Sequence, residues 1–461
     1  MTNWNNTHTL ILGAARQGIA LARWLSRHGS HVILSDLRSM EQLASARDLL
    51  ADTNVEWAAG GHPIELLDGM DVLCLSGGIP LTLPIVQEAV KRGILLSNDT
   101  QIFLEVAPCK TIGITGSAGK TTTTTLVGEM AKQHFKTHTK QSAFIGGNIG
   151  DPLINYVDQM NADDLAIIEI SSFQLEQMTI SPNISAILNI TPNHLDRHGT
   201  MEAYTDAKAR ILEFQTEKDT AILSHDDKGA WNLRNQVKGK LRTFSLNTLT
   251  DDLNGAYFHD GLLSLRDGNA HLPLMAREKI KLPGAHNVAN VLAAFTIGHA
   301  AGFKLDDMLE AVEDFRGVAH RLEFVRELRG VRWYNGSIAT APERSMADIN
   351  AFTTEPIVLM LGGRDKNLPW DGIAKLIHQR VDHVVVFGEA AELIKKAVSA
   401  VGGAGVDVRR AGNLKEAVTA AAELASAGDV VLFSPGGTSY DEFKDFEERG
   451  ETFRKWVLEL S

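Results

Sequence analysis

The stretch Gly113-Ile114-Thr115-Gly116-Ser117-Ala118-Gly119-Lys120-Thr121 decides the fold of the middle of the chain. An apolar strand-like run, Thr111–Ile114, precedes the turn, and a helix-like run, Thr122–Lys132, follows it. In such a turn successive glycines let backbone N–H groups face inward around phosphate oxygens, and the helix N-terminus adds a partial positive charge. Lys120 can reach the β- and γ-phosphates, and Thr121 can offer its hydroxyl to Mg²⁺. The stretch therefore predicts a nucleotide-phosphate loop.

The loop departs from the strict G-x-x-x-x-G-K-[ST] pattern, because Ile114 stands where the first glycine belongs. A glycine-rich turn with an exposed lysine is the alternative interpretation. The order of strand, Gly-rich turn, Lys-Thr and helix favours the phosphate loop. By itself such a loop implies only nucleotide hydrolysis or transfer.

Strand-like runs alternate with helix-like runs from end to end, which is typical of parallel α/β sheets. At roughly 150 residues per domain, 461 residues suggest about three domains. We expect a Rossmann-like domain at 1–107, a central P-loop ATPase-type α/β domain with a parallel sheet at 108–317, and a Rossmann-like α/β domain at 318–461. The strand-like runs are Thr9–Leu12, His31–Leu34, Asp71–Ser76, Lys110–Thr115, Asp164–Ile170, Ser185–Ile190, Thr220–Ser224, Pro356–Leu361, His383–Phe387 and Asp429–Ser434. The weakly periodic Lys240–Lys281 suggests β-hairpins added to the central domain.

The composition is that of an ordinary globular protein, with 44% hydrophobic residues and a formal net charge of −12. This acidic balance argues against non-specific binding to nucleic acid, which depends on positive charge. The N-terminus lacks the features of a signal peptide, and no apolar run approaches the length of a membrane span. Cys74 and Cys109 lie in or beside apolar runs and are expected to be reduced core thiols. We expect a cytoplasmic protein with no membrane insertion.

Three further features lie along the central segment. Glu169 sits near the carboxyl end of an apolar strand, where ligands bind in open α/β sheets, so it either holds a metal or simply reaches solvent. The next strand leads into the polar loop Thr191–Gly199, which is either a ligand site or a hydrogen-bonded loop. Lys208, within the helix-like Ala203–Phe214, is by spacing alone an ordinary surface lysine.

Taken together, these pieces resemble the Mur ligase family, in the branch that adds glutamate. The motifs that carry the resemblance run in order along the chain: T-G-S-A-G-K-T (115–121), G-G-N-I-G (146–150), E-I-S-S-F-Q-L-E (169–176), N-H-L-D-R-H (193–198), A-K-A-R-I (207–211), L-P-G-A-H-N-V-A-N (282–290), A-H-R-L-E (319–323), L-G-G-R-D-K (361–366) and S-P-G-G-T-S-Y-D-E-F-K-D-F (434–446). The resemblance implies an ATP- and Mg²⁺-dependent ligase that adds D-glutamate to UDP-N-acetylmuramoyl-L-alanine through an acyl phosphate, in peptidoglycan precursor synthesis. We also expect a monomer.

The resemblance assigns roles position by position. Lys120, His194 and Lys208 would be catalytic, and the metal would be held by Thr121, Glu169, His194 and a carbamylated Lys208. ATP would contact Gly116, Ser117, Ala118, Gly119, Lys120, Thr121, Thr122, Asn148, Asn287, Asn290 and Arg321. The UDP substrate would contact Arg16, Gln17, Asp36, Arg38, Ser76, Gly77, Gly78 and Asn148. The incoming glutamate would contact Thr340, Lys366, Ser439 and Phe446.

One segment departs from the family pattern. The run Asn335–Thr340 aligns with a motif usually written N-D-S-K-A-T, but Gly336 replaces its aspartate and Ile338 its lysine. The loss of the lysine opens the alternative that L-glutamate is the substrate, and the loss of the aspartate opens the alternative of a Mur-like protein that binds nucleotide sugar without ligating. A Rossmann oxidoreductase is a further alternative, but it leaves the phosphate loop without a role.

Overall fold

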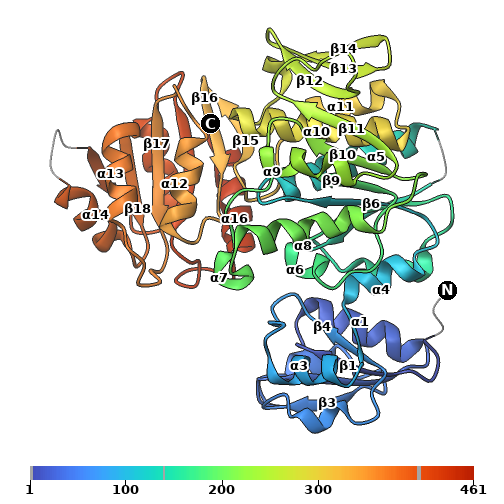
Figure 1. Ribbon diagram of the computed structural model, residues 1–461. Coiled ribbons are helices and arrows are strands. Elements are labelled where there is room, and N and C mark those ends of the chain that lie inside the picture. Colours follow the sequence, from blue (N-terminus) through green and yellow to red (C-terminus); the bar gives the residue numbers. More distant parts are fainter. Residues whose placement is uncertain (1–3, 139–140, 402–405) are drawn as a thin grey trace. The chain divides into compact units, whose positions relative to one another are not determined.

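The computed structural model describes residues 4–138, 141–401 and 406–461, and Figure 1 shows their helices and strands. These residues form three β-sheets, each flanked by helices. By their contacts they divide into two compact units, residues 1–277 with 289–312, and residues 278–288 with 313–461. The expected α/β class is confirmed, whereas the exact domain boundaries stay a prediction.

The first sheet is parallel throughout, with the strand order β3-β2-β1-β4-β5. Its strands are β1 (His8–Leu12), β2 (His31–Asp36), β3 (Glu56–Ala59), β4 (Val72–Leu75) and β5 (Leu95–Ser97), and its helices are α1 (Arg16–Arg27), α2 (Ala44–Asp48), α3 (Pro84–Lys91) and α4 (Asp99–Val106). The central strand β1 is buried on both faces from Thr9 onward, as expected for a sheet covered by helices. β1 lies between β2 and β4, and the chain crosses from β3 on one side of the sheet to β4 on the other. The strand order therefore reverses at β1 and β4, which places a ligand-binding crevice at their carboxyl ends.

The second sheet has the order β14-β13-β12-β11-β10-β9-β6-β8-β7. Its strands are β6 (Lys110–Thr115), β7 (Ala143–Gly147), β8 (Leu165–Glu169), β9 (Ile184–Ile187), β10 (Thr220–Ser224), β11 (Lys240–Ser245), β12 (Gly255–His259), β13 (Leu262–Asp267) and β14 (Ala270–Ala276). Its helices are α5 (Lys120–His138), α6 (Ser172–Leu175), α7 (Leu195–His198), α8 (Met201–Glu213), α9 (Lys228–Trp231), α10 (Ala285–Ala301) and α11 (Leu305–Asp314). The hairpin expectation is confirmed for β12–β14, which Figure 1 shows at one end of the sheet, but β11 pairs parallel with β10.

The third sheet has the order β15-β16-β20-β17-β18-β19, and only β15 runs antiparallel to its neighbour. Its strands are β15 (Glu323–Leu328), β16 (Val331–Asn335), β17 (Ile357–Gly362), β18 (His383–Phe387), β19 (Asp407–Arg410) and β20 (Val430–Gly436), and its helices are α12 (Pro342–Asn350), α13 (Asp371–Arg380), α14 (Ala391–Ala400), α15 (Leu414–Leu424) and α16 (Phe446–Glu459). Because β20 pairs with both β16 and β17, the loops that follow these three strands meet at one edge of the sheet.

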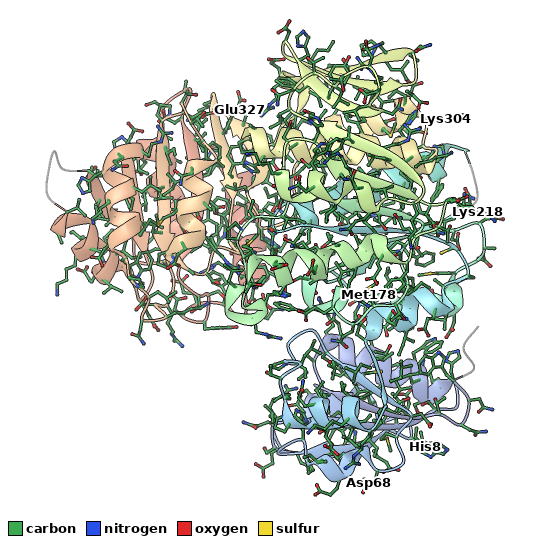
Figure 2. The ribbon with its side chains drawn as sticks, viewed as in Figure 1. His8, Asp68, Met178, Lys218, Lys304 and Glu327 are labelled. Atoms are coloured by element: carbon green, nitrogen blue, oxygen red, sulfur yellow. The ribbon has the colours of Figure 1, made fainter. Side chains whose placement is uncertain are left out.

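Polar and apolar side chains separate as in other globular proteins. Asp68, Lys218, Lys304 and Glu327 are exposed, and Met178 is fully buried (Figure 2). Cys74 and Cys109 are buried free thiols, so the expectation of reduced core cysteines is confirmed. Within the part of the chain that the structure describes, every helix is too short or too polar to cross a bilayer.

Candidate active site

The phosphate loop lies at the carboxyl end of β6, the strand between β8 and β9. Gly119 has a φ of +82°, a conformation that side chains other than glycine rarely adopt, and it turns the chain into α5. Asn189 holds the loop from outside, since its side chain accepts from the Ala118 N–H at 2.8 Å and donates to the Ala118 carbonyl at 3.1 Å. The loop is therefore fixed in shape, as a rigid phosphate cradle requires.

Two lysines converge on this loop. Lys120 Nζ donates to the Gly116 carbonyl oxygen at 2.9 Å, and Lys208 Nζ donates to the same oxygen at 3.0 Å. The Lys208 side chain is 1% exposed and lies 4.7 Å from the centre of the Tyr204 ring. Burial, together with the charge of Lys120, lowers the pKa of Lys208 to about 7. The interpretation of Lys208 as a surface lysine is therefore wrong.

A lysine with a pKa near neutrality has a share of neutral, nucleophilic amine at physiological pH. Two like charges on one carbonyl are also unfavourable unless an anion joins them or one of them is modified. The geometry around Gly116 thus suits both a bound phosphate and the carbamylation that the family resemblance implies for Lys208.

Glu169, the last residue of β8, is 2% exposed. Its Oε1 accepts from Asn148 Nδ2 at 2.9 Å, while its Oε2 is buried without a hydrogen-bond partner. A buried carboxylate oxygen with no donor is costly unless a cation faces it. Glu169 and Thr121 supply the oxygen ligands that Mg²⁺ prefers, so this part of the predicted set fits the metal.

His194 lies on the loop after β9, exposed, with a φ of +53° and its ring 5.1 Å from the ring of Phe173. Within the described residues no three His, Cys, Asp or Glu side chains form a ready metal site. Mg²⁺ commonly takes one or two protein ligands and completes its shell with waters and phosphate oxygens, so a sparse site is compatible with it.

Of the other predicted ATP contacts, Asn290 belongs to the unit that holds the phosphate loop, whereas Asn287 and Arg321 belong to the second unit. The Asn290 side chain lies beside Gly119, because a Cβ on that glycine would meet its Oδ1. Asn287 Nδ2 donates to the Pro283 carbonyl at 2.7 Å. Arg321 stands between His320 and Leu322, which have φ values of +64° and +46°, so its backbone is held in a strained turn of the kind found at functional sites.

In the first sheet the predicted UDP residues gather at the β1/β4 crevice. Ser76 Oγ donates to the Gly13 carbonyl at 2.9 Å. Asp36 accepts from the Ala14 N–H at 2.7 Å and from Arg38 Nε and Nη2 at 2.9 Å, which holds the pKa of its carboxyl well below the usual range. Arg16 and Arg38 line one surface hollow. Since Arg38 already engages Asp36, the carboxylate positions the arginine and the Gly13–Ala14 turn.

In the third sheet the predicted glutamate residues surround the loops after β16, β17 and β20. Lys366 Nζ donates to Thr340 Oγ1 at 3.3 Å. Ser439 is 2% exposed, and Phe446 opens α16, where its carbonyl accepts from Ser337 Oγ at 2.8 Å.

Sequence reasoning missed Arg449, whose side chain links the loops that follow β16 and β20. The guanidinium is fully buried and donates to Ser337 Oγ at 3.1 Å, the Ser337 carbonyl at 2.8 Å and the Gly437 carbonyl at 3.0 Å. Burial lowers its pKa to about 10. A buried arginine ties two loops together because it offers five donors in a rigid plane, and its place inside α16 gave no sequence signal. Asn189 was also missed, although it lies just after β9, a strand that the sequence predicts.

These features define a P-loop nucleotide-binding α/β protein. Family models match along the chain: a MurD-like N-terminal domain at residues 7–97, a Mur ligase middle domain at 114–298, and a Mur ligase glutamate ligase domain at 320–437. Two curated relatives are both named UDP-N-acetylmuramoylalanine–D-glutamate ligase. The one from Symbiobacterium thermophilum is 38% identical over 98% of both chains, and that from Thermoanaerobacter sp. is 39% identical over 98% of both.

Solved structures share the fold at lower identity. The alanine ligase MurC of Thermotoga maritima has a TM-score of 0.55 at 20% identity and covers 98% of this chain and 99% of its own. MurF of Acinetobacter baumannii has a TM-score of 0.57 at 16% identity, and the match covers 98% of this chain and 93% of that MurF chain. A MurF from Thermotoga maritima, solved in complex with ADP, has a TM-score of 0.52 at 17% identity and covers 100% of both chains. The chain belongs to the Mur ligase family.

Proposed function

We propose that this chain ligates D-glutamate to UDP-N-acetylmuramoyl-L-alanine at the expense of ATP, in peptidoglycan precursor synthesis. The observation that carries the proposal is the phosphate loop, in which Lys120 and Lys208 both donate to one carbonyl oxygen. Relatives that are named for this reaction match the chain over 98% of its length. ATP and UDP-linked sugars are cytoplasmic, so we place the enzyme there, acting as a monomer of the domains 1–107, 108–317 and 318–461.

The reaction follows from the weakness of a carboxylate as an acyl donor. The alanine carboxylate attacks the γ-phosphorus of ATP, the bond to the β–γ bridging oxygen breaks, and ADP leaves. The glutamate amine then attacks the acyl carbon of the resulting acyl phosphate, phosphate departs and the nitrogen loses a proton. The protein contributes mainly position and charge.

Particular residues supply that charge. Lys120 and the backbone N–H groups at the start of α5 neutralise the transferring phosphoryl group. Mg²⁺, held by Thr121, Glu169 and His194, would draw charge from the phosphate oxygens. Lys208 would react as the neutral amine with CO₂, forming an N–C bond and releasing a proton, and its carbamate would add a further oxygen ligand.

Product analysis by mass spectrometry tests this function. Incubation with ATP, Mg²⁺, UDP-N-acetylmuramoyl-L-alanine and D-glutamate should yield one amide product and ADP, and omission of any component or addition of a chelator should abolish both. ADP formation that is independent of glutamate would contradict ligation. Intact-protein mass spectrometry in the presence of bicarbonate should show one added CO₂, which the Lys208→Arg variant should lack.

L-glutamate is the second candidate substrate, because Ile338 removes a positive charge next to the predicted amino-acid site. The same assay with the two enantiomers separates the two.

A further inference from the structure

The segment that departs from the family pattern lies against α12. A Cβ on Gly336 would come within 2.7 Å of Asp348 Oδ2 and 2.8 Å of the Phe433 carbonyl oxygen. The space that a side chain at position 336 would enter therefore already holds a carboxylate, which comes from α12 instead.

Asp348 is held in this position. Ser434 Oγ, at the end of β20, donates to its Oδ2 at 2.7 Å. Burial raises the pKa of its carboxyl to about 7, against the opposing positive charges of Arg321 and Arg344. The Ile338 N–H donates to the carbonyl of His320 at 3.1 Å, so Arg321, the next residue and the predicted phosphate contact, follows a residue bonded to this segment.

The second missing charge has a counterpart on the same helix. Arg344 lies four residues before Asp348, on the same face of α12. Its Nη1 donates to the Ile338 carbonyl at 3.2 Å, so a cation reaches the residue that lacks the expected lysine. The side chain is exposed, and Thr340, which accepts from Lys366, follows two residues after Ile338.

We propose that two side chains of α12 replace the aspartate and the lysine that this segment lacks. Arg344 binds a carboxylate of the incoming glutamate alongside Lys366, and Asp348 positions Arg321. This inference rests on the proposed function and extends it to two residues outside the family's motif. Arg344 is a substrate-binding residue. Asp348 is a positioning residue that acts through Arg321, the predicted ATP contact.

The Arg344 arm is tested by steady-state kinetics with glutamate varied. Arg344→Ala should raise KM for glutamate at least about tenfold, the effect of losing a charged hydrogen bond, with KM for ATP unchanged. Arg409→Ala, an exposed arginine on the far edge strand β19, is the matched control and should match the wild type. Ile338→Lys added to Arg344→Ala should recover most of the loss. A KM for glutamate in Arg344→Ala within twofold of the control overturns this arm.

The Asp348 arm uses the isosteric Asp348→Asn variant with ATP varied. KM for ATP should rise at least about fivefold while KM for glutamate stays within about twofold, because the charge that orients Arg321 is lost. Gly336→Asp with Asp348→Ala should restore KM for ATP by returning the carboxylate to the loop. An unchanged KM for ATP in Asp348→Asn, in a variant with the wild-type melting temperature, overturns this arm whether or not the double variant folds.

A wild-type enzyme without glutamate-dependent ADP formation overturns the proposed function and this inference together. A wild-type enzyme that turns over, with Arg344→Ala and Asp348→Asn indistinguishable from it, overturns this inference alone.

Discussion

At the scale of single residues, the carbonyl oxygen of Gly116 accepts hydrogen bonds from both Lys120 and Lys208. The Lys120 position follows from the motif, because the phosphate loop fixes which lysine points at the phosphates. The burial of Lys208 could not be read from spacing, since one lysine in an amphipathic helix is usually exposed. Only the family resemblance pointed to it.

Lys120→Ala should remove turnover, with a fall in kcat/KM of at least about a hundredfold, because the charge that develops on the transferring phosphoryl group loses its nearest cation. The fold should persist, since Lys120 is only partly buried and is the first residue of α5. Phosphate release and thermal unfolding measure the two effects. Near wild-type turnover in a folded variant would mean that the loop has been misinterpreted.

At the scale of elements, the turn from β6 into α5 depends on a glycine. Gly119→Ala would place a Cβ against Asn290 Oδ1 in a backbone with a φ of +82°. We expect a lower melting temperature and a raised KM for ATP, because the strained turn and the displaced Asn290 both deform the phosphate cradle. Gly69→Ala is the matched control, since Gly69 has a φ of +76° and open space around its Cβ position. If the two variants behave alike in KM for ATP, the cradle does not depend on Gly119.

The start of α4 carries a pH-dependent contribution to stability. Burial raises the pKa of Asp99 from 3.8 to about 6, so between these values the native state binds more protons than the unfolded chain. Stability from this group is therefore lost as the pH rises through that window.

Asp99→Asn should accordingly be more stable than the wild type at pH 8, by about 3 kcal/mol, and the difference should shrink towards pH 4. Urea unfolding at both pH values measures it. The exposed Asp163→Asn is the control and should show no such trend. A difference independent of pH would contradict a buried ionised Asp99.

The elements themselves were predictable where both faces are buried. Lys110–Thr115, Thr220–Ser224 and His383–Phe387 match β6, β10 and β18 residue for residue, since near-continuous apolar runs mark such strands. Strands at or near sheet edges, such as β3 (Glu56–Ala59) and β19 (Asp407–Arg410), were missed, because they are short and partly exposed. Their pairing depends on neighbouring strands and has no local pattern.

At the scale of the whole molecule, the order of the motifs along the chain predicted the fold class and the family, and both predictions are confirmed. The roles of individual site residues stay predictions. Sequence reasoning found the loop after β6 from its motif, and Glu169 and the loop after β9 from their places at strand ends. The sites after β1, β16 and β20 came from the family resemblance. Sequence reasoning could not find side chains that enter such an edge from a helix, as Asp348 of α12 and Arg449 of α16 do, because that depends on tertiary packing.

Ligation of D-glutamate by this chain is measured by phosphate release with UDP-N-acetylmuramoyl-L-alanine, ATP and Mg²⁺, with D- or L-glutamate as the third substrate. The account predicts release that requires all the components and a kcat/KM at least about tenfold higher for D-glutamate. Equal or higher activity with L-glutamate, or release that does not depend on either amino acid, would contradict it.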